Sequence, residues 1–222
     1  MVTVVDGFLA GLDPSDVDAL TAWGQARRFR RGAMLFHEGA DAEHVLIVRS
    51  GRVKVSSYTA DGKEVVLAVR GPGELLGELS AIDGEPRSAS ASALEQVDVL
   101  SVPAEDFRTF LGLRPRAAVT MMKLLSRKLR DADRKRIEFG AHDTVGRVCH
   151  RLVELAERFG ERSGEGLRIT VPLSQLELAG WTGASREAVS KALHQLRTRG
   201  YIETARRGIT VLDMAALRKR AT

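Results

Sequence analysis

The chain has 222 residues, of which 44% are hydrophobic and 28% charged, a composition typical of folded globular proteins and not of disordered ones. Its single cysteine, Cys149, excludes an internal disulfide and any metal or iron–sulfur site built from four cysteines. No apolar run approaches the roughly 20 residues of a membrane span, and the N-terminal residues lack the pattern of an export signal, so we expect a cytoplasmic protein.

Charge is distributed unevenly along the chain. Residues 1–113 contain 11 Lys and Arg against 17 Asp and Glu, a net charge of −6, whereas residues 114–141 and 142–222 carry +6 and +5. An acidic first half followed by a basic second half indicates that only the second half contacts a polyanion. Solvated helices also favour Lys and Arg, so the asymmetry alone leaves nucleic-acid binding open.

The first 100 residues change from a helical to a strand-like pattern. Residues 1–30 are predicted to form short helices, because Asp13 offers an N-cap and Pro14 fits the first helical position. From about residue 31 to 103, apolar strand-like runs alternate with turn signals. The turn signals lie at Ser50-Gly51, Asp61-Gly62, Gly71-Pro72-Gly73 and Asp83-Gly84. Many short strands at such spacing predict an antiparallel sandwich or jelly-roll barrel.

A proline-free helical stretch follows from about Arg116 to Phe139. Seven positions alternate steps of four and three, the spacing of a coiled-coil seam: Ala118, Met122, Leu125, Leu129, Ala132, Arg136 and Phe139. Met121 and Leu124 form a second apolar flank that could face the barrel. The pattern favours a seam between two copies of the helix, and the alternative is a helix buried once against its own domain.

The remaining sequence predicts a helix-turn-helix with a wing. An amphipathic helix ends at Gly160, and the polar loop ERSGEG leads to the short strand-like run LRITVPL. Residues 174–180 and 185–199 are predicted as two helices joined by a glycine-containing turn at 181–183, followed by a hairpin that turns near Arg207-Gly208. The apolar positions expected to pack the two helices together are Leu176, Ala179, Val189, Leu193 and Leu196.

The start of the second helix carries a small, polar and basic set of side chains. The residues expected to remain exposed there are Ser185, Arg186, Glu187, Ser190 and Lys191. Arg186 and Lys191 can donate to guanine, Glu187 can accept from cytosine N4, and Ser185 can cap the helix or donate to a phosphate. Arg206 and Arg207 of the hairpin would reach the DNA backbone. A protein-docking module is the alternative, but the polar basic face favours DNA reading.

The stretch GELSAIDGEPRSASA, from Gly77 to Ala91, combines a lone acid, a lone base and small residues. Backbone N–H groups of a helical turn at Gly77–Ser80 would form a small anion site. Arg87 offers a bidentate fork for a phosphate, Ser88 adds a hydroxyl donor, and Glu78 would accept from a ribose hydroxyl. A cyclic nucleotide presents both groups. Without a ligand, Glu78 and Arg87 would form an ordinary ion pair, and that alternative stays open.

These motifs make the chain similar to the cyclic AMP receptor protein family, within the wider CRP/FNR group that includes the fumarate-nitrate reduction regulators. The resemblance covers nearly the whole chain and rests on three segments: Gly77-Glu78-Leu79 with Pro86-Arg87-Ser88-Ala89, Asp143-Thr144-Val145-Gly146-Arg147-Val148, and Gly183-Ala184-Ser185-Arg186-Glu187-Ala188-Val189.

The resemblance implies an α+β homodimeric transcription factor with three parts. They are a cyclic-nucleotide-binding jelly-roll barrel at 1–115, a dimerisation helix at 116–140 and a winged helix-turn-helix at 141–222. The implied ligand is a cyclic nucleotide, with cyclic AMP expected, and the implied partners are double-stranded DNA with TGTGA-like half-sites, a second copy of the chain and RNA polymerase. Carried onto this sequence, the nucleotide-binding residues are Gly77, Glu78, Leu79, Ser80, Arg87, Ser88, Lys128, Ala132 and Asp133.

The sequence departs from the family pattern where the base would lie. Ala132 and Asp133 stand where the family's dimer helix usually offers a threonine and then a serine or asparagine, and Lys128 stands where arginine is frequent. The ribose-phosphate half of the site matches the family pattern, whereas the half that would contact the base does not. A regulator of the same fold with a vestigial pocket, or one selective for cyclic GMP, is therefore the alternative.

Two further function classes are a redox sensor of the same fold and an enzyme. A redox sensor would need ligands that a single cysteine and five scattered histidines do not supply, so no metal or haem is expected. Haem remains the alternative, and a colourless purified protein would exclude it. An enzyme would need a nucleophile with a base or a metal-ligand spacing, and neither is present in the sequence, so no catalytic residue is assigned.

Overall fold

The computed structural model describes residues 7–164, 166–205 and 208–221. Contacts divide the chain into two compact units, Met1–Ser57 with Leu67–Asp131, and Tyr58–Val66 with Ala132–Thr222. The helices are the short 3-10 turn η1 (Leu9–Gly11), α1 (Pro14–Trp23), α2 (Glu78–Asp83), α3 (Ala104–Leu113), α4 (Pro115–Ala141), α5 (Thr144–Phe159), α6 (Gln175–Thr182), α7 (Arg186–Thr198) and α8 (Met214–Ala221). The strands are β1 (Gln25–Phe29), β2 (Met34–Phe36), β3 (His44–Ser50), β4 (Val53–Tyr58), β5 (Glu64–Arg70), β6 (Leu75–Leu76), β7 (Ser90–Ala93), β8 (Val97–Pro103), β9 (Gly160–Ser163), β10 (Gly166–Ile169), β11 (Ile202–Ala205) and β12 (Gly208–Val211).

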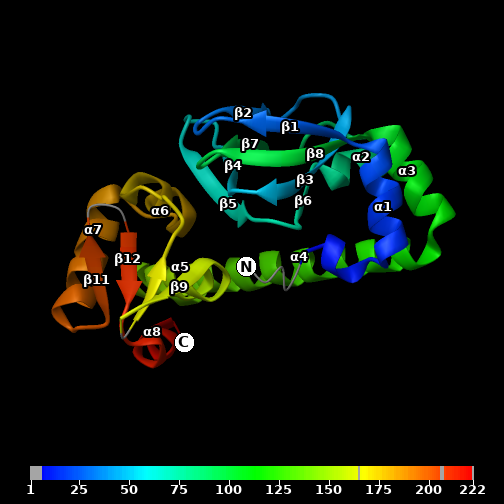
Figure 1. The fold of residues 1–222 in the computed structure, drawn as a ribbon. Helices are drawn as coiled ribbons and strands as arrows, with labels where there is room; N and C mark the ends of the chain where they lie inside the picture. The colour runs from blue at the N-terminus through cyan, green and yellow to red at the C-terminus, as the bar shows by residue number, and fades with distance from the viewer. Residues whose placement is uncertain (1–6, 165, 206–207, 222) are drawn as a thin grey trace. The chain divides into compact units, whose positions relative to one another are not determined.

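The N-terminal strands form two four-stranded sheets with the orders β1-β8-β3-β6 and β2-β7-β4-β5 (Figure 1). Neighbouring strands pair in the antiparallel direction, as in β3 with β8 and β4 with β7. The expected jelly-roll arrangement is confirmed, as two sheets that do not join into one closed barrel. The Asp61-Gly62 signal does connect the paired strands β4 and β5, whereas Ser50-Gly51 carries the chain from one sheet to the other.

The sequence of strand β3 is a continuous apolar run because both faces of the strand are covered. Leu46 and Val48 pack in the cluster between the two sheets, while Val45 and Ile47 pack in a second cluster with the helices. Because successive side chains point to opposite faces of a strand, a strand covered on both faces must be apolar at every position.

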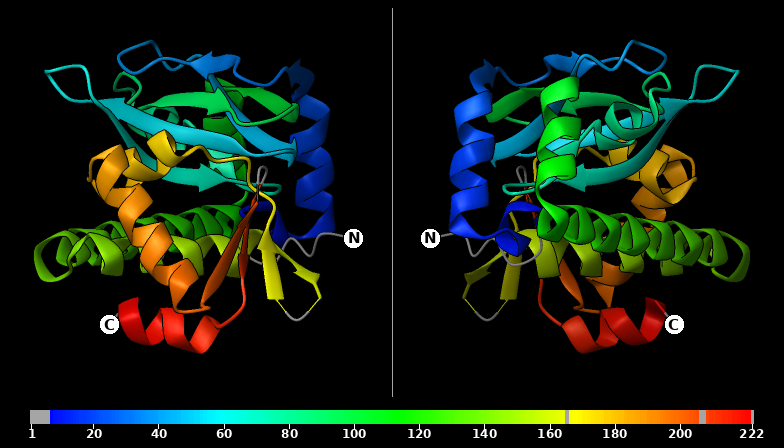
Figure 2. Two further views of the ribbon diagram at one scale, coloured as in Figure 1. Left: turned by 90° about the vertical axis from the view of Figure 1, so that its left-hand side faces the viewer. Right: turned by 90° about the vertical axis from the view of Figure 1, so that its right-hand side faces the viewer.

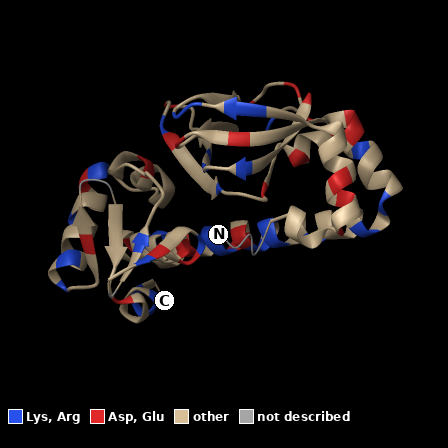
Figure 3. Cartoon of the chain, viewed as in Figure 1, with Lys and Arg blue, Asp and Glu red and all other residues tan. Residues whose placement is uncertain are grey.

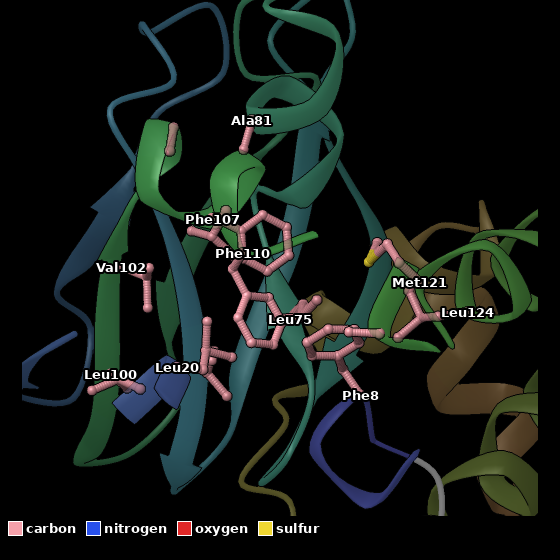
Figure 4. Packing of buried hydrophobic residues seen from close by; sticks show 14 residues of the cluster. Phe8, Leu20, Leu75, Ala81, Leu100, Val102, Phe107, Phe110, Met121 and Leu124 are labelled. Carbon is pink, nitrogen blue, oxygen red and sulfur yellow. The ribbon is translucent and has the colours of Figure 1, made fainter. Parts of the chain in front are cut away.

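The second cluster is built around three aromatic rings from two segments, the residue before η1 and helix α3. Phe8, Phe107 and Phe110 are fully buried there, and Met121 and Leu124 join them from α4 (Figure 4). Helices α1 and α3 lie beside the strands in Figures 1 and 2, and both contact β8. The predicted second apolar flank of α4 is therefore confirmed as the face that packs in this core.

Two segments differ from the expected secondary structure. Residues 25–29, expected to be helical, form strand β1, which pairs with β8 from Gln25↔Ser101 to Phe29↔Val97. Residues of the expected loop ERSGEG contribute to strand β9, which pairs with β10. Both segments are mainly polar and exposed, so they lack the alternation that marks a half-buried strand, and only their pairing partners define them.

The C-terminal unit contains α5 to α8 and a four-stranded sheet of order β11-β12-β10-β9. The side chain of Asp143 caps α5 by accepting from the Gly146 N–H at 2.8 Å, and the apolar face of α5 is buried. The predicted closing hairpin is confirmed as β11 and β12, whereas its tip, Arg206 and Arg207, lies outside the described residues. Within the described ranges, no helix is long and apolar enough to cross a membrane.

Candidate ligand and DNA-binding sites

Arg87 occupies a pocket of backbone and aromatic atoms between β6 and β7. Its side chain is only about 5% exposed, its Nη1 donates to the Gly77 carbonyl at 2.8 Å, and its Nη2 donates to the His44 carbonyl at 2.5 Å. The guanidinium carbon lies 4.6 Å from the centre of the Phe36 ring. The buried Nε has no hydrogen-bond partner among the described residues. A buried cation with an unused N–H donor can bind an anion by donating to it.

Burial also changes the protonation energetics of Arg87. Loss of hydration lowers the pKa of the guanidinium, while the carboxylates of Glu78 and Glu43 act in the opposite direction. An arginine nevertheless stays charged in a protein. A buried charge without a paired anion is costly, so an anion placed beside it would be stabilising.

The backbone before α2 allows the close approach of Arg87. Gly77 has φ 76°, in the left-handed region, and a Cβ at this position would lie 2.1 Å from the Arg87 Nη1. Glycine is thus required both by the backbone conformation and by the neighbouring guanidinium.

Glu78 does not pair with Arg87, which corrects the expected ligand-free ion pair. Glu78 is 3% exposed, and its Oε1 lies 2.6 Å from the Nζ of Lys128 on α4. Burial lowers the pKa of Lys128, and the Glu78 carboxylate opposes that shift. The pair connects the acid of the motif to the long helix.

The other predicted ligand residues have different environments. Ser80 is buried and its hydroxyl donates to the Pro86 carbonyl at 3.2 Å, so it holds the loop together. Leu79 and Ser88 are exposed. Ala132 and Asp133 are exposed on α4, and no Asp133 ion pair with a neighbouring arginine of that helix is found in the described chain.

Both helices of the helix-turn-helix begin one residue later than predicted, and residues 183–185 lie between them. Ser174 caps α6 through a reciprocal capping box with Glu177, and Gly183 ends that helix. Ser185 caps α7 by accepting from the Ala188 N–H at 3.1 Å, which confirms its predicted capping role. Residues 181 and 182 therefore belong to α6 and not to the turn.

The buried face of the pair differs from the prediction at one position. Ala179, Val189, Leu193 and Leu196 are buried as expected, but Leu176 is 68% exposed. Leu178 and Trp181 are buried in its place. Leu176 lies in the first turn of α6, outside the stripe of side chains that faces the core.

The predicted reading face of α7 is accessible in the single chain. Ser185, Arg186, Glu187, Ser190 and Lys191 are all exposed. Lys and Arg residues lie along α7 and at the end of α8 (Figure 3). Hydrogen bonds from its own backbone N–H and from Ser185 lower the pKa of Glu187, so this residue is an acceptor at neutral pH. The face combines donors and one acceptor, as base recognition requires.

A polar cluster near the end of α4 was missed from the sequence. The buried Glu138 carboxylate binds Arg151 of α5, and the Nδ1 of His150 lies 3.4 Å from its Oε1. The rings of His142 and His150 have centres 5.1 Å apart, so the histidines are not all scattered as expected. No group of three potential metal ligands is present within the described ranges.

Comparison with known proteins identifies the family. Residues 26–112 match the cyclic nucleotide-binding domain, and residues 146–220 match the Crp-like helix-turn-helix domain. The chain is 36% identical over 215 residues to the CRP-like cAMP-activated global transcriptional regulator of Mycobacterium tuberculosis, covering 97% of this chain and 96% of that protein. The chain belongs to the CRP/FNR family of transcriptional regulators.

Other members of the CRP/FNR family support the assignment. The Cyclic AMP receptor protein of Thermus thermophilus is 34% identical over 210 residues, with 93% of each chain covered. The crystal structure of TTHB099, a CRP-family regulator from Thermus thermophilus, superposes with a TM-score of 0.75 at 28% identity and covers 88% of this chain and 96% of that one. CRP/FNR proteins are transcription regulators and not enzymes, and their helix-turn-helix domain supports DNA binding.

Proposed function

We propose that the chain is a homodimeric, sequence-specific DNA-binding regulator gated by a cyclic nucleotide, with cyclic AMP as the effector. The observation that carries the nucleotide assignment is Arg87, a buried guanidinium whose Nε has no acceptor in the described part of the chain. A ring phosphate is an anion, and charge-assisted hydrogen bonds to arginine are among the strongest that proteins form. Ser88, which is exposed, adds a hydroxyl donor.

Glu78 would bind the ribose hydroxyl of the nucleotide. A carboxylate has about four acceptor positions on two oxygens, and the contact at 2.6 Å from Lys128 engages Oε1. The second oxygen can accept a hydroxyl proton while the ion pair persists. Nucleotide binding would in this way act directly on a residue paired with α4.

The base end of the site supports weak selectivity. Ala132 has no polar side-chain atom, so one contact to adenine would be missing. Asp133 is an acceptor when ionised and could bind the amine of adenine or the N1–H and amine of guanine. We expect weaker discrimination against cyclic GMP than is usual for the family, and a smaller effect of ligand on DNA affinity.

The C-terminal unit would read a palindrome with TGTGA-like half-sites. Arg186, Glu187 and Lys191 supply the donors and acceptor for base edges, and two such helices in a dimer read half-sites about 34 Å apart. The exposed seam of α4 would join the subunits. RNA polymerase is the proposed protein partner, and the cytoplasm is the proposed location because the DNA target is there.

Calorimetry with cyclic AMP and cyclic GMP tests the nucleotide assignment. Arg87→Leu should abolish binding of both nucleotides while the N-terminal unit stays folded, as judged by circular dichroism and thermal unfolding. Arg28→Leu is the matched control, since Arg28 is an exposed arginine of the same unit that pairs with Asp98. Undiminished binding by Arg87→Leu would overturn the site. A wild-type chain that binds DNA but neither nucleotide would favour the alternative of a vestigial pocket.

A further inference from the structure

A basic groove adjoins the predicted base-reading face, shares Ser190 and Lys191 with it, and was not recognised from the sequence. It has a volume of about 450 Å³ and is bounded by α7 from Ser190 to Arg197, by the first residue of α6 and by strand β11. The left view of Figure 2 shows α7 in orange beside β11 in red, and the two elements are in contact. The lining residues that matter here are Ser190, Lys191, His194, Arg197 and Thr204.

Arg197 is held in place within this groove by two hydrogen bonds. Its Nη1 donates to the Thr204 hydroxyl at 3.2 Å, and its Nη2 lies 3.0 Å from the Nδ1 of His194. Arginine only donates, so the His194 Nδ1 must accept and the Nε2 must carry the ring proton. A guanidinium has five N–H donors, and these contacts use two of them. The groove therefore presents free donors in a fixed geometry.

The charged side chains that line the groove are cationic, so the groove favours an anion. Lys191 and Arg197 contribute cations, His194 contributes an N–H donor, and none of the described residues that line the groove is acidic. The nearest acid on β11, Glu203, adjoins Thr204 in sequence, and successive side chains of a strand point to opposite faces. Glu187 lies in the first turn of α7 and belongs to the predicted base-reading set.

The position of Arg197 along α7 distinguishes it from the base-reading residues. Ser190, His194 and Arg197 have the spacing i, i+4, i+7 and share one side of the helix. Arg197 follows Arg186 by eleven residues, which at 1.5 Å per residue is roughly 16 Å along the helix axis. The major groove of DNA is only about 12 Å wide. If the first turn of α7 contacts base edges, Arg197 extends past them to the flanking sugar-phosphate strand.

We infer that Arg197, supported by His194 and Thr204, binds a backbone phosphate of DNA outside the base-reading contacts. The inference rests on the DNA-binding function proposed above. Phosphate contacts fix the register and orientation of the protein without reading sequence. The structural alternative is that Arg197 only braces β11 against α7 through Thr204.

The test measures binding of the full-length chain to a palindromic and a random duplex by fluorescence anisotropy over a range of salt concentrations, with saturating cyclic AMP. Arg197→Ala should weaken both complexes by the same factor. The slope of log K against log salt should become shallower by about 1.8 for a dimer, since each phosphate contact contributes about 0.9. Arg197→Lys should keep the wild-type slope, because the charge remains. Arg186→Ala should lose affinity mainly for the palindrome.

Thr204→Val separates phosphate binding from bracing. This variant removes the hydroxyl that holds Arg197 but keeps the cation, so its salt slope should equal that of the wild type. Loss of affinity by Thr204→Val equal to that of Arg197→Ala, or an unchanged slope in Arg197→Ala, would overturn the inference while leaving the DNA-binding function in place. A wild-type chain that binds neither duplex would overturn both.

Discussion

The predicted phosphate site depends on which atoms surround the buried Arg87. The guanidinium is bonded to two carbonyl oxygens and faces one aromatic ring, and none of these is an anion. Peptide oxygens satisfy N–H donors but do not neutralise a buried charge. The site is therefore electrostatically incomplete in the single chain, and Gly77 keeps it open at the point of closest contact.

Gly77→Ala should prevent nucleotide binding while the N-terminal unit stays folded. The new Cβ would lie 2.1 Å from the Arg87 Nη1, so the guanidinium must move. Gly84→Ala is the matched control, because Gly84 has a similar φ of 79° but no atom within 4 Å of an added Cβ. Both variants should lose about 1 kcal/mol of stability from backbone strain. Calorimetry should then detect cyclic AMP binding by Gly84→Ala only, and equal affinities would contradict the role given to Gly77.

At the scale of elements, the end of α4 is attached to α5 by charge and not by apolar packing alone. Glu138 and Arg151 are both buried, and Arg151 also donates to Glu154 at 2.6 Å. His150 is partly buried against Glu138, Arg151 and the ring of His142. Arg151 and His142 both disfavour the charged form of His150, so a proton on His150 is poorly accommodated.

This cluster predicts that the C-terminal unit is less stable in acid. Burial lowers the pKa of His150, with Arg151 and His142 acting in the same direction, while Glu138 and the backbone of Ala221 oppose them. A base with a lowered folded-state pKa binds its proton more readily when unfolded. The contribution of His150 is therefore complete above its unfolded value of 6.5 and is lost as the pH falls below it.

Thermal unfolding between pH 8 and pH 5 measures this effect. The melting temperature of the wild type should fall below about pH 6.5, and His150→Gln should reduce that fall. His37→Gln, which replaces an exposed histidine of the other unit, should keep the wild-type profile. A His150→Gln profile identical to that of the wild type would contradict the assignment.

At the scale of the molecule, the single chain leaves an apolar stripe uncovered. Met122, Leu129 and Phe139 of the predicted seam are exposed on α4, while Met121 and Leu124 of the same helix are buried in the N-terminal core. One face of α4 thus packs in the N-terminal core, and the other has the apolar pattern of an interface with a second copy of the chain.

Leu129→Glu should dissociate the dimer, because a charge in the seam would have to be buried without a partner. Sedimentation velocity should report a dimer for the wild type and a monomer for the variant at micromolar concentrations. Leu113→Glu is the matched control, since Leu113 is 67% exposed and Leu129 64% exposed, but Leu113 ends α3 outside the seam. A dimer that survives Leu129→Glu would show that subunits associate elsewhere.

Local sequence patterns determined much of the architecture. The hairpin signal at Asp61-Gly62, the cap at Ser185 and the period of α4 each depend on residues close in the chain. Asp13 occupies the predicted N-cap position of α1, but its side chain makes no capping hydrogen bond and instead accepts from Arg116. Such signals act through backbone geometry and hydrogen bonds within a few residues, so they can be recognised without knowing the fold. The motif at Gly77–Ser88 was recognised in the same way.

Tertiary structure alone decided the features that depend on distant partners. Strand β1 exists because β8 accepts it, and its polar sequence carries no signal of its own. Glu78 binds Lys128, fifty residues away, and not the nearer Arg87, because the fold brings α4 against the motif. The Arg197 groove likewise needs β11 beside α7. Pairing energies between remote residues depend on distance and burial in three dimensions, and a linear sequence records neither.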